Sequence, residues 1–307
     1  MENRVSDNRP IPALMVVISA VMWGTYGSFV TAVTDLGMER NAQMFLRFLM
    51  TVIPTGIYMA VRDKSLFQIR KKDLRLFFAN AIFSLYFFSA CYAAAITRTK
   101  IATAAALLYT APVIVMILSA LLFREKMTGM KIFCVLLSAA GCAFASGIAG
   151  EIADSEGSPV TAAGILLGLG AGLGYALYSI FSRMILNRGY SVYTNIFYSF
   201  SIVTVIFLAA SVHDGTIKQI FDLPGATALA AACGLVTGFG SYLLYTLGME
   251  KMETSRAAQL ATIEPVTATI LGCVLFRQPL SGFEAAGIAL VVLSVILISS
   301  VSRHSRT

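Results

Sequence analysis

Residues 103–112 read Thr-Ala-Ala-Ala-Leu-Leu-Tyr-Thr-Ala-Pro, and residues 256–265 read Arg-Ala-Ala-Gln-Leu-Ala-Thr-Ile-Glu-Pro. The two stretches lie 153 positions apart (103 to 256), which is about half of the 307-residue chain. The same separation relates residues 122–125, Leu-Phe-Arg-Glu, to residues 275–278, Leu-Phe-Arg-Gln. A constant offset between separate stretches indicates an internal duplication. We therefore predict two structural repeats, each about half the chain long.

The composition places these repeats in a membrane. Hydrophobic residues make up 57% of the chain and charged residues only 13%, and the mean hydropathy is +0.78. A soluble domain carries about a quarter charged residues. So few charges cannot coat a soluble protein of this size, which excludes an ordinary soluble enzyme, a disordered chain and a disulfide scaffold. The composition predicts an all-α integral membrane protein.

Apolar runs of about 20 residues, the length that crosses the hydrocarbon core, occur ten times. We predict ten transmembrane helices in two units of five, residues 11–150 and residues 160–301. Because five is odd, the second unit enters the membrane upside down, and such inverted repeats are a transporter architecture. The runs are Ile11–Thr34, Ala42–Val61, Leu74–Thr97, Ile101–Phe123, Met130–Gly150, Val160–Met184, Val192–Ser211, Gly225–Leu247, Ala257–Phe276 and Phe283–Val301.

The basic residues orient the predicted helices. Excess Lys and Arg mark cytoplasmic segments. With the N-terminus inside, most of the 23 Lys and Arg residues fall in cytoplasmic segments, above all between residues 62 and 75. The segment Glu151–Ser158 would lie outside, and it holds three acids and no base. We predict that both termini lie in the cytoplasm.

Three motifs carry a resemblance to a known family. They are Trp23-Gly24 in the first helix, Leu122-Phe123-Arg124-Glu125 at the end of the fourth, and Ile263-Glu264-Pro265-Val266 in the ninth. With the ten-helix pattern, they resemble the EamA-like family of the drug/metabolite transporter superfamily over about residues 11–301. The ninth helix departs from the family pattern because it ends Phe276-Arg277-Gln278, without the usual Gly-Glu. The resemblance implies transport of small metabolites by alternating access, often export of amino acids or related solutes.

Two ionisable residues, Glu264 and Arg47, lie well inside the predicted helices. Charges within a membrane are costly and usually functional. Glu264 is a candidate to bind an amine or cation or to carry a proton, and the alternative is that it braces neighbouring helices. Arg47 is a candidate to bind a substrate carboxylate. The alternative, slightly favoured, is that it reaches the outer interface or satisfies carbonyls of a broken helix.

Pro112 and Pro265 are repeat mates, each following a short polar or small-residue stretch within a predicted helix. Proline has no N–H, so Pro265 deprives the Ala261 carbonyl of its helical donor. Freed backbone groups are tolerated at membrane depth only beside protein or a water-lined cavity. Broken helices in corresponding positions of two repeats point to a central binding site. We expect both prolines to mark helix breaks at which gating occurs.

Aromatic side chains are the next candidates for substrate contact, because their faces attract amines. Trp23, the sole tryptophan, Tyr26, Tyr109 and Tyr175 lie deepest. Gln259 is a neutral polar candidate at plausible depth. Many aromatic residues within membranes serve only packing, so these assignments are hypotheses.

Other features indicate packing rather than chemistry. Gly164, Gly168 and Gly172 form a stripe of small residues that permits close approach of another helix. The histidines, His213 and His304, lie outside the apolar runs, which argues against a Ser-His-Asp arrangement or a Cys/His metal site. We predict no cofactor, no metal, no nucleic-acid partner and no enzymatic activity.

The sequence thus predicts a secondary transporter in the cell (inner) membrane. It would move an amino acid, amine or related solute, with export favoured, and protons are a candidate coupling ion. Membrane lipids would surround a monomer or homodimer, with the helices at 130–150 and 283–301 at the periphery. The alternative is a membrane protein that handles lipid or acts as a scaffold and moves no soluble solute.

Overall fold

The computed structural model describes residues 10–99, 101–147 and 161–304, and within this part of the chain every regular element is helical. Nine helical stretches are long and apolar enough to span a membrane, and α8 (Gly129–Ala145) is a shorter apolar helix. The predicted runs at Met130–Gly150 and Val160–Met184 each extend beyond the described residues at one end, and the predicted outer segment Glu151–Ser158 lies wholly outside them. Large apolar side chains such as Leu121, Leu166 and Val274 remain exposed, as a lipid-facing surface requires. The chain is a multi-pass membrane protein.

Several of these stretches are interrupted. The uninterrupted long helices are α3 (Arg40–Arg62), α10 (Ala162–Leu186), α11 (Val192–His213) and α17 (Gly282–His304). The interrupted stretches are α1–α2 (Pro10–Gly24, Tyr26–Asp35), α4–η3–α5 (Leu74–Ala79, Asn80–Tyr86, Phe87–Ile96), α6–α7 (Ile101–Leu108, Ala111–Phe123), α13–η5–α14 (Pro224–Cys233, Gly234–Gly240, Ser241–Glu250) and α15–α16 (Thr254–Leu260, Ile263–Phe276). Short helical turns fill the connections: η1 (Lys64–Phe67), η2 (Lys71–Asp73), η4 (Thr216–Lys218) and α12 (Gln219–Asp222).

The interruptions follow the repeat in the sequence. The breaks between α6 and α7 and between α15 and α16 fall at equivalent positions of the two repeats. α7 and α16, the helices that follow these two breaks, each end at a residue in the left-handed conformation. These residues are Arg124, with φ of 57°, and Arg277, with φ of 55°. These are the two non-glycine residues with positive φ in the described part of the chain. That conformation is costly for a side chain with Cβ, and it recurs at two positions that are 153 residues apart.

Two π-helical segments, η3 and η5, also occupy equivalent positions. A π-helical turn holds one more residue than an α-helical turn, and such segments are frequent at functional sites. Residues that follow η3 or η5 are therefore rotated relative to an uninterrupted α-helix. This rotation decides which side chains of α5 and α14 face the interior.

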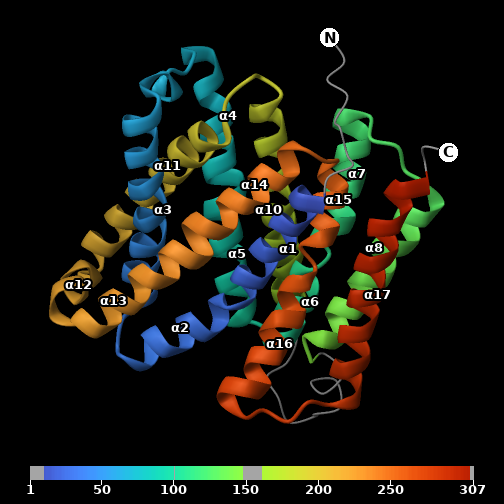
Figure 1. Ribbon diagram of the computed structural model, residues 1–307. Helices are drawn as coiled ribbons and strands as arrows, with labels where there is room; N and C mark the ends of the chain where they lie inside the picture. The colour runs from blue at the N-terminus through green and yellow to red at the C-terminus, as the bar shows by residue number, and fades with distance from the viewer. Residues whose placement is uncertain (1–9, 100, 148–160, 305–307) are drawn as a thin grey trace.

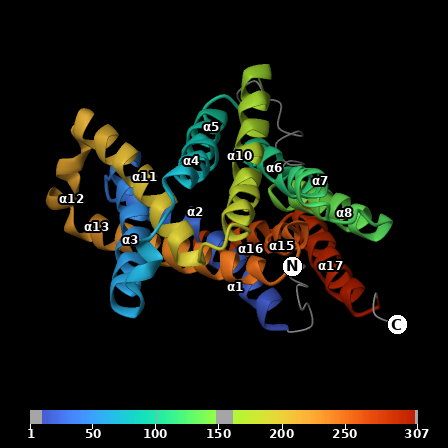
Figure 2. The ribbon, with the colours of Figure 1, turned by 90° about the horizontal axis from the view of Figure 1, so that it is seen from above.

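The helices gather into a bundle with α10 near its centre and two groups at opposite edges (Figures 1 and 2). One edge is formed by α3, α11 and α13, and the other by α8 and α17. At that second edge Gly141 and Gly287 allow close contact, because a Cβ on Gly287 would lie 2.7 Å from the Gly141 carbonyl oxygen. The expected peripheral position of these last two helices is confirmed.

The predicted glycine stripe on α10 also packs closely. A Cβ on Gly168 would lie 2.6 Å from Leu107 Cδ1, and one on Gly172 would lie 2.7 Å from Thr110 Oγ1. Leu107 lies in α6, and Thr110 lies in the break that follows it. The stripe therefore holds the central helix directly against an interrupted helix, as close approach through small residues requires.

Candidate substrate-binding site

The break between α15 and α16 places Glu264 in the first turn of α16. The Glu264 N–H donates to the Ala261 carbonyl oxygen at 3.0 Å. This tight turn supplies a donor for the carbonyl that Pro265 deprives of one, so the expected free carbonyl is satisfied within the chain. The turn also directs the Glu264 side chain into the bundle, where the side chain is half-buried.

A glycine makes room for this turn. Gly24 ends α1, and a Cβ built on it would lie 2.7 Å from the Glu264 carbonyl oxygen and 2.5 Å from Thr267 Cβ. Both separations are shorter than ordinary van der Waals contact. The Trp23-Gly24 pair therefore places the end of α1 directly on the start of α16, with the indole beside the Glu264 region.

The Glu264 carboxylate has one hydrogen-bond donor among the described side chains. Tyr175 of α10 donates its hydroxyl to Glu264 Oε2 at 2.7 Å. The Tyr175 ring also meets Trp23 edge-on, with ring centroids 6.0 Å apart. Arg47 forms no ion pair with Glu264, and the ion pairs of the described residues lie elsewhere. The carboxylate thus retains oxygen lone pairs for a further donor.

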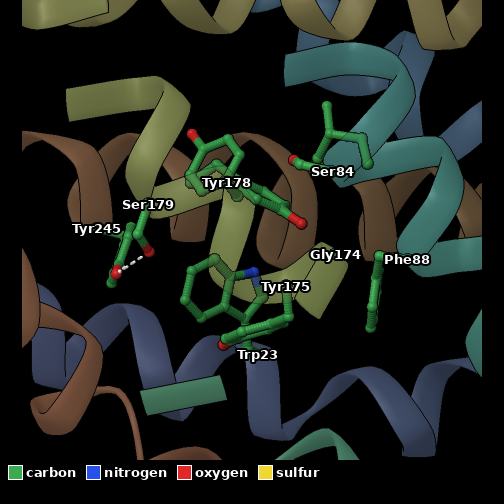
Figure 3. Close-up of a pocket in the computed structure, with 10 residues that line it drawn as sticks. Trp23, Ser84, Phe88, Gly174, Tyr175, Tyr178, Ser179 and Tyr245 are labelled. Atoms are coloured by element: carbon green, nitrogen blue, oxygen red, sulfur yellow. Dashed lines mark hydrogen bonds between the residues drawn. The ribbon is translucent and has the colours of Figure 1, made fainter. Parts of the chain in front are cut away.

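A narrow hollow opens beside the Tyr175 end of this hydrogen bond. Trp23 forms one wall, with its ring centroid 5.0 Å from that of Tyr242 and 5.2 Å from that of Tyr245. Ser179 and Tyr245 share a hydrogen bond of 2.6 Å at one side of the hollow (Figure 3). The lining residues are Trp23, Ser84, Leu85, Phe88, Gly174, Tyr175, Tyr178, Ser179, Tyr242 and Tyr245. Aromatic faces and a few hydroxyls suit a small solute with an apolar or cationic part.

The structure brings three of the sequence candidates together: Trp23 and Tyr175 line the hollow, and Glu264, which is not itself a lining residue, accepts the hydrogen bond from Tyr175. Tyr109 lies at the break between α6 and α7 and packs against an apolar cluster that includes Cys142 and Val266. Pro112 and Pro265 lie in the first turns of α7 and α16, immediately after the two breaks.

Arg47 and Tyr26 form a separate site. The Arg47 guanidinium carbon lies 4.2 Å from the centre of the Tyr26 ring. Arg47 Nε donates to Thr237 Oγ1 at 3.1 Å, and Nη2 donates to the Thr237 carbonyl oxygen at 3.2 Å. Thr237 lies in the π-helical segment η5. Arg47 thus bonds to a carbonyl of a distorted helix, the kind of contact that its bracing alternative expects, and it also lines a second, narrow hollow with Tyr26.

Gln259 is buried in α15. Its Nε2 atom has no hydrogen-bond acceptor among the described residues. Because Gln259 is not among the residues that line either hollow, the structure does not bring it to the aromatic site.

Sequence reasoning gave too little weight to Ser84, Phe88, Ser179 and Tyr242, which all line the hollow. Three of these four lie in or after the π-helical segments. One signal was available: the 153-residue offset relates Tyr92 to Tyr245, and each of these tyrosines packs in the interior, Tyr92 against the cluster around Cys91 and Tyr245 in the cluster that holds Trp23.

An all-helical membrane bundle in which broken helices meet at an ionisable side chain beside a hollow is typical of membrane transporters. The model of the EamA-like transporter family matches residues 10–147 and 162–300. The chain belongs to this family, and it is a membrane transporter.

Relatives agree with this assignment over almost the whole chain. "Uncharacterized transporter YwfM" of Bacillus subtilis (strain 168) is 25% identical over 97% of this chain and 96% of its own. An "Uncharacterized transporter" of Archaeoglobus fulgidus is 27% identical over 92% of this chain and 94% of its own. A solved structure titled "Crystal structure of protein" has the same fold, with a TM-score of 0.81 and 16% identity, over 98% of this chain and 100% of that chain. A location in the inner cell membrane fits the bacterial relatives.

Proposed function

We propose that the protein is a secondary transporter that moves a small metabolite across the cytoplasmic membrane by alternating access, in the export direction. The substrate is an amino acid, an amine or a related solute. It occupies the hollow beside Trp23, and Glu264 accepts its ammonium group or carries a coupled proton. The observation that supports this proposal is the Glu264 carboxylate at a helix break, with a single tyrosine donor and an aromatic hollow beside it.

The proposal includes the topology. Ten helices form two inverted units, residues 11–150 and 160–301, with both termini in the cytoplasm. The matched helix breaks and left-handed residues support the two units. The excess of basic residues between 62 and 75 supports the orientation.

Solute flux into proteoliposomes tests the function. Purified protein is first screened for thermal stabilisation by amino acids, amines, nucleosides and sugars, and each stabilising solute is then assayed for flux with and without a pH gradient. We expect one class to cross. Lipid scrambling without solute flux would support the lipid-handling alternative and contradict the proposal.

Glu264→Gln tests the site. Gln keeps the shape and can still accept from Tyr175, but it lacks the negative charge. A hydrogen bond to a charged group contributes about 1.5–3 kcal/mol, so we expect flux to fall by roughly 10-fold or more, or to lose its pH dependence. Glu284→Gln is the matched control, because Glu284 is also half-buried but accepts only from the Ser281 N–H at the start of α17, away from the hollow. Equal flux by the wild type and Glu264→Gln at every pH would reduce Glu264 to a structural role.

A further inference from the structure

The start of α15 is capped by a residue from the other repeat. The first N–H groups of a helix have no partners within it, and a local side chain usually accepts from them. The residue at the cap position of α15, Glu253, makes no such bond. Instead Glu125, which follows α7, accepts from the Thr254 N–H at 2.7 Å, from the Ser255 N–H at 3.1 Å and from the Ser255 hydroxyl at 2.5 Å.

A second contact joins the same two segments. Lys131, in the first turn of α8, forms an ion pair of 2.5 Å with Glu253. Its ammonium group also donates to the Lys126 carbonyl oxygen at 3.0 Å. Each of the residues 253, 254 and 255 therefore forms at least one bond with the first repeat, through its side chain or its backbone N–H. We call Glu125, Lys131 and residues 253–255 the latch.

The latch closes one end of the bundle, the end at which α7 and α10 finish and α15 begins (upper part of Figure 1). At this end Arg183 of α10 donates to the Met249 and Met252 carbonyl oxygens and to Thr254 Oγ1. The connection from α14 to α15 is thus fixed to the helix that carries Tyr175 and Ser179 of the hollow. Movement of α15 away from α7 would leave its first N–H groups without acceptors.

Among the described residues, the carboxylate at position 125 has no counterpart in the other repeat. The mate of Glu125 is Gln278, and both follow a left-handed arginine. Gln278 is exposed, and its Oε1 atom lies beside Gly272 of its own helix, where an added Cβ would be 2.8 Å away. Among the described residues, the Gln278 side chain forms no hydrogen bond with α6, the mate of α15. The two turns share the left-handed arginine, and the side chain that follows it is a carboxylate in one turn and an amide in the other.

We propose that Glu125 is the positioning residue of a gate: it holds α15 against α7 to keep this end of the bundle closed, and its release opens the hollow to this side. The inference rests on the alternating access proposed above. A carboxylate suits the task because it accepts from three donors at once, whereas an amide oxygen is a weaker acceptor.

Sided labelling of the hollow tests the gate without a substrate. Ser179→Cys places a thiol in the hollow, and a membrane-impermeant maleimide is applied to right-side-out and inside-out vesicles. The unmodified chain gives the background of its own cysteines, four of which are buried. For Glu125→Gln in the Ser179→Cys background, we expect labelling from the latch side to rise roughly 10-fold, the equilibrium shift for one weakened charge-assisted bond, and labelling from the opposite side to fall.

Two further variants keep the test decisive. Ser255→Ala removes one donor to Glu125 and should shift labelling in the same direction by a smaller factor. Glu284→Gln removes a carboxylate that caps a helix within its own repeat, and should leave labelling unchanged. Unchanged labelling in Glu125→Gln, or an equal rise on both sides, would show a merely structural cap and overturn the gate. Flux of the wild type in proteoliposomes is measured separately, so that failure of the gate is distinguishable from failure of the transport proposal.

Discussion

Gly24→Ala should separate α1 from α16 at the candidate site. The new Cβ would lie 2.5 Å from Thr267 Cβ and 2.7 Å from the Glu264 carbonyl oxygen. Ordinary contacts require roughly 1 Å more, and the second of these contacts is with backbone that cannot rotate away. Inserting a methylene-sized group into a packed interior typically costs about 1–3 kcal/mol. We expect Gly24→Ala to lower the free energy of unfolding by that amount.

Gly27→Ala is the matched control. Gly27 lies three residues further on, in α2, and an added Cβ there meets nothing within 4 Å. Because alanine favours a helix over glycine by up to about 1 kcal/mol, this variant should be as stable as the wild type or more so. Titration with sodium dodecyl sulfate in mixed micelles measures the free energy of unfolding of the wild type, Gly24→Ala and Gly27→Ala. If Gly24→Ala matched Gly27→Ala in stability, the close approach of α1 and α16 would be refuted.

Three other variants test separate contacts. Tyr175→Phe removes the donor to Glu264 and should change the KM or the pH profile of flux, since the bond joins a charged acceptor; an unaltered profile would show that this hydroxyl is dispensable. Arg47→Lys should destabilise the protein by about 1–3 kcal/mol in the same titration. The reason is that an ammonium cannot reproduce both bonds to Thr237 and the contact with the Tyr26 ring. Full stability of this variant would contradict the bracing role. The Asp214 side chain accepts from Asn41 and Thr216, and these bonds hold its pKa below the usual value. Its contribution to stability is therefore present above the ordinary carboxyl pKa and lost as the pH falls through the lowered value. The difference in melting temperature between wild type and Asp214→Asn should accordingly shrink as the pH falls through about 4 and below, and a constant difference would contradict this.

Of the five interrupted stretches, the sequence predicted the two with breaks before Pro112 and Pro265. It predicted the residues that line the hollow less well. The offset between Pro112 and Pro265 was enough to locate both breaks, because proline acts on its own backbone and needs no knowledge of packing. Glu264 was found because an acid at membrane depth stands out against an apolar background. These features are local, so one sequence reveals them.

The lining of the hollow depends on helix rotation. Ser84 lies within η3, Phe88 follows it, and Tyr242 follows η5. The extra residue in a π-helical turn shifts the helical phase, so a 3.6-residue periodicity read through residues 80–86 or 234–240 assigns the wrong faces. Likewise, the sequence placed Arg47 within a predicted helix, but only the tertiary structure shows that it is buried and contacts Thr237. The capping of α15 by Glu125 joins residues about 130 positions apart in the chain, and no local pattern indicates it.

We propose that the transported solute occupies the hollow beside Trp23. This residue is the sole tryptophan of the chain, so the intrinsic fluorescence of the purified protein reports on that one wall. Titration with a solute that crosses proteoliposomes should change the emission saturably, with a half-maximal concentration that follows the concentration dependence of flux. Emission that stays constant at concentrations that saturate flux would contradict the assignment of the site.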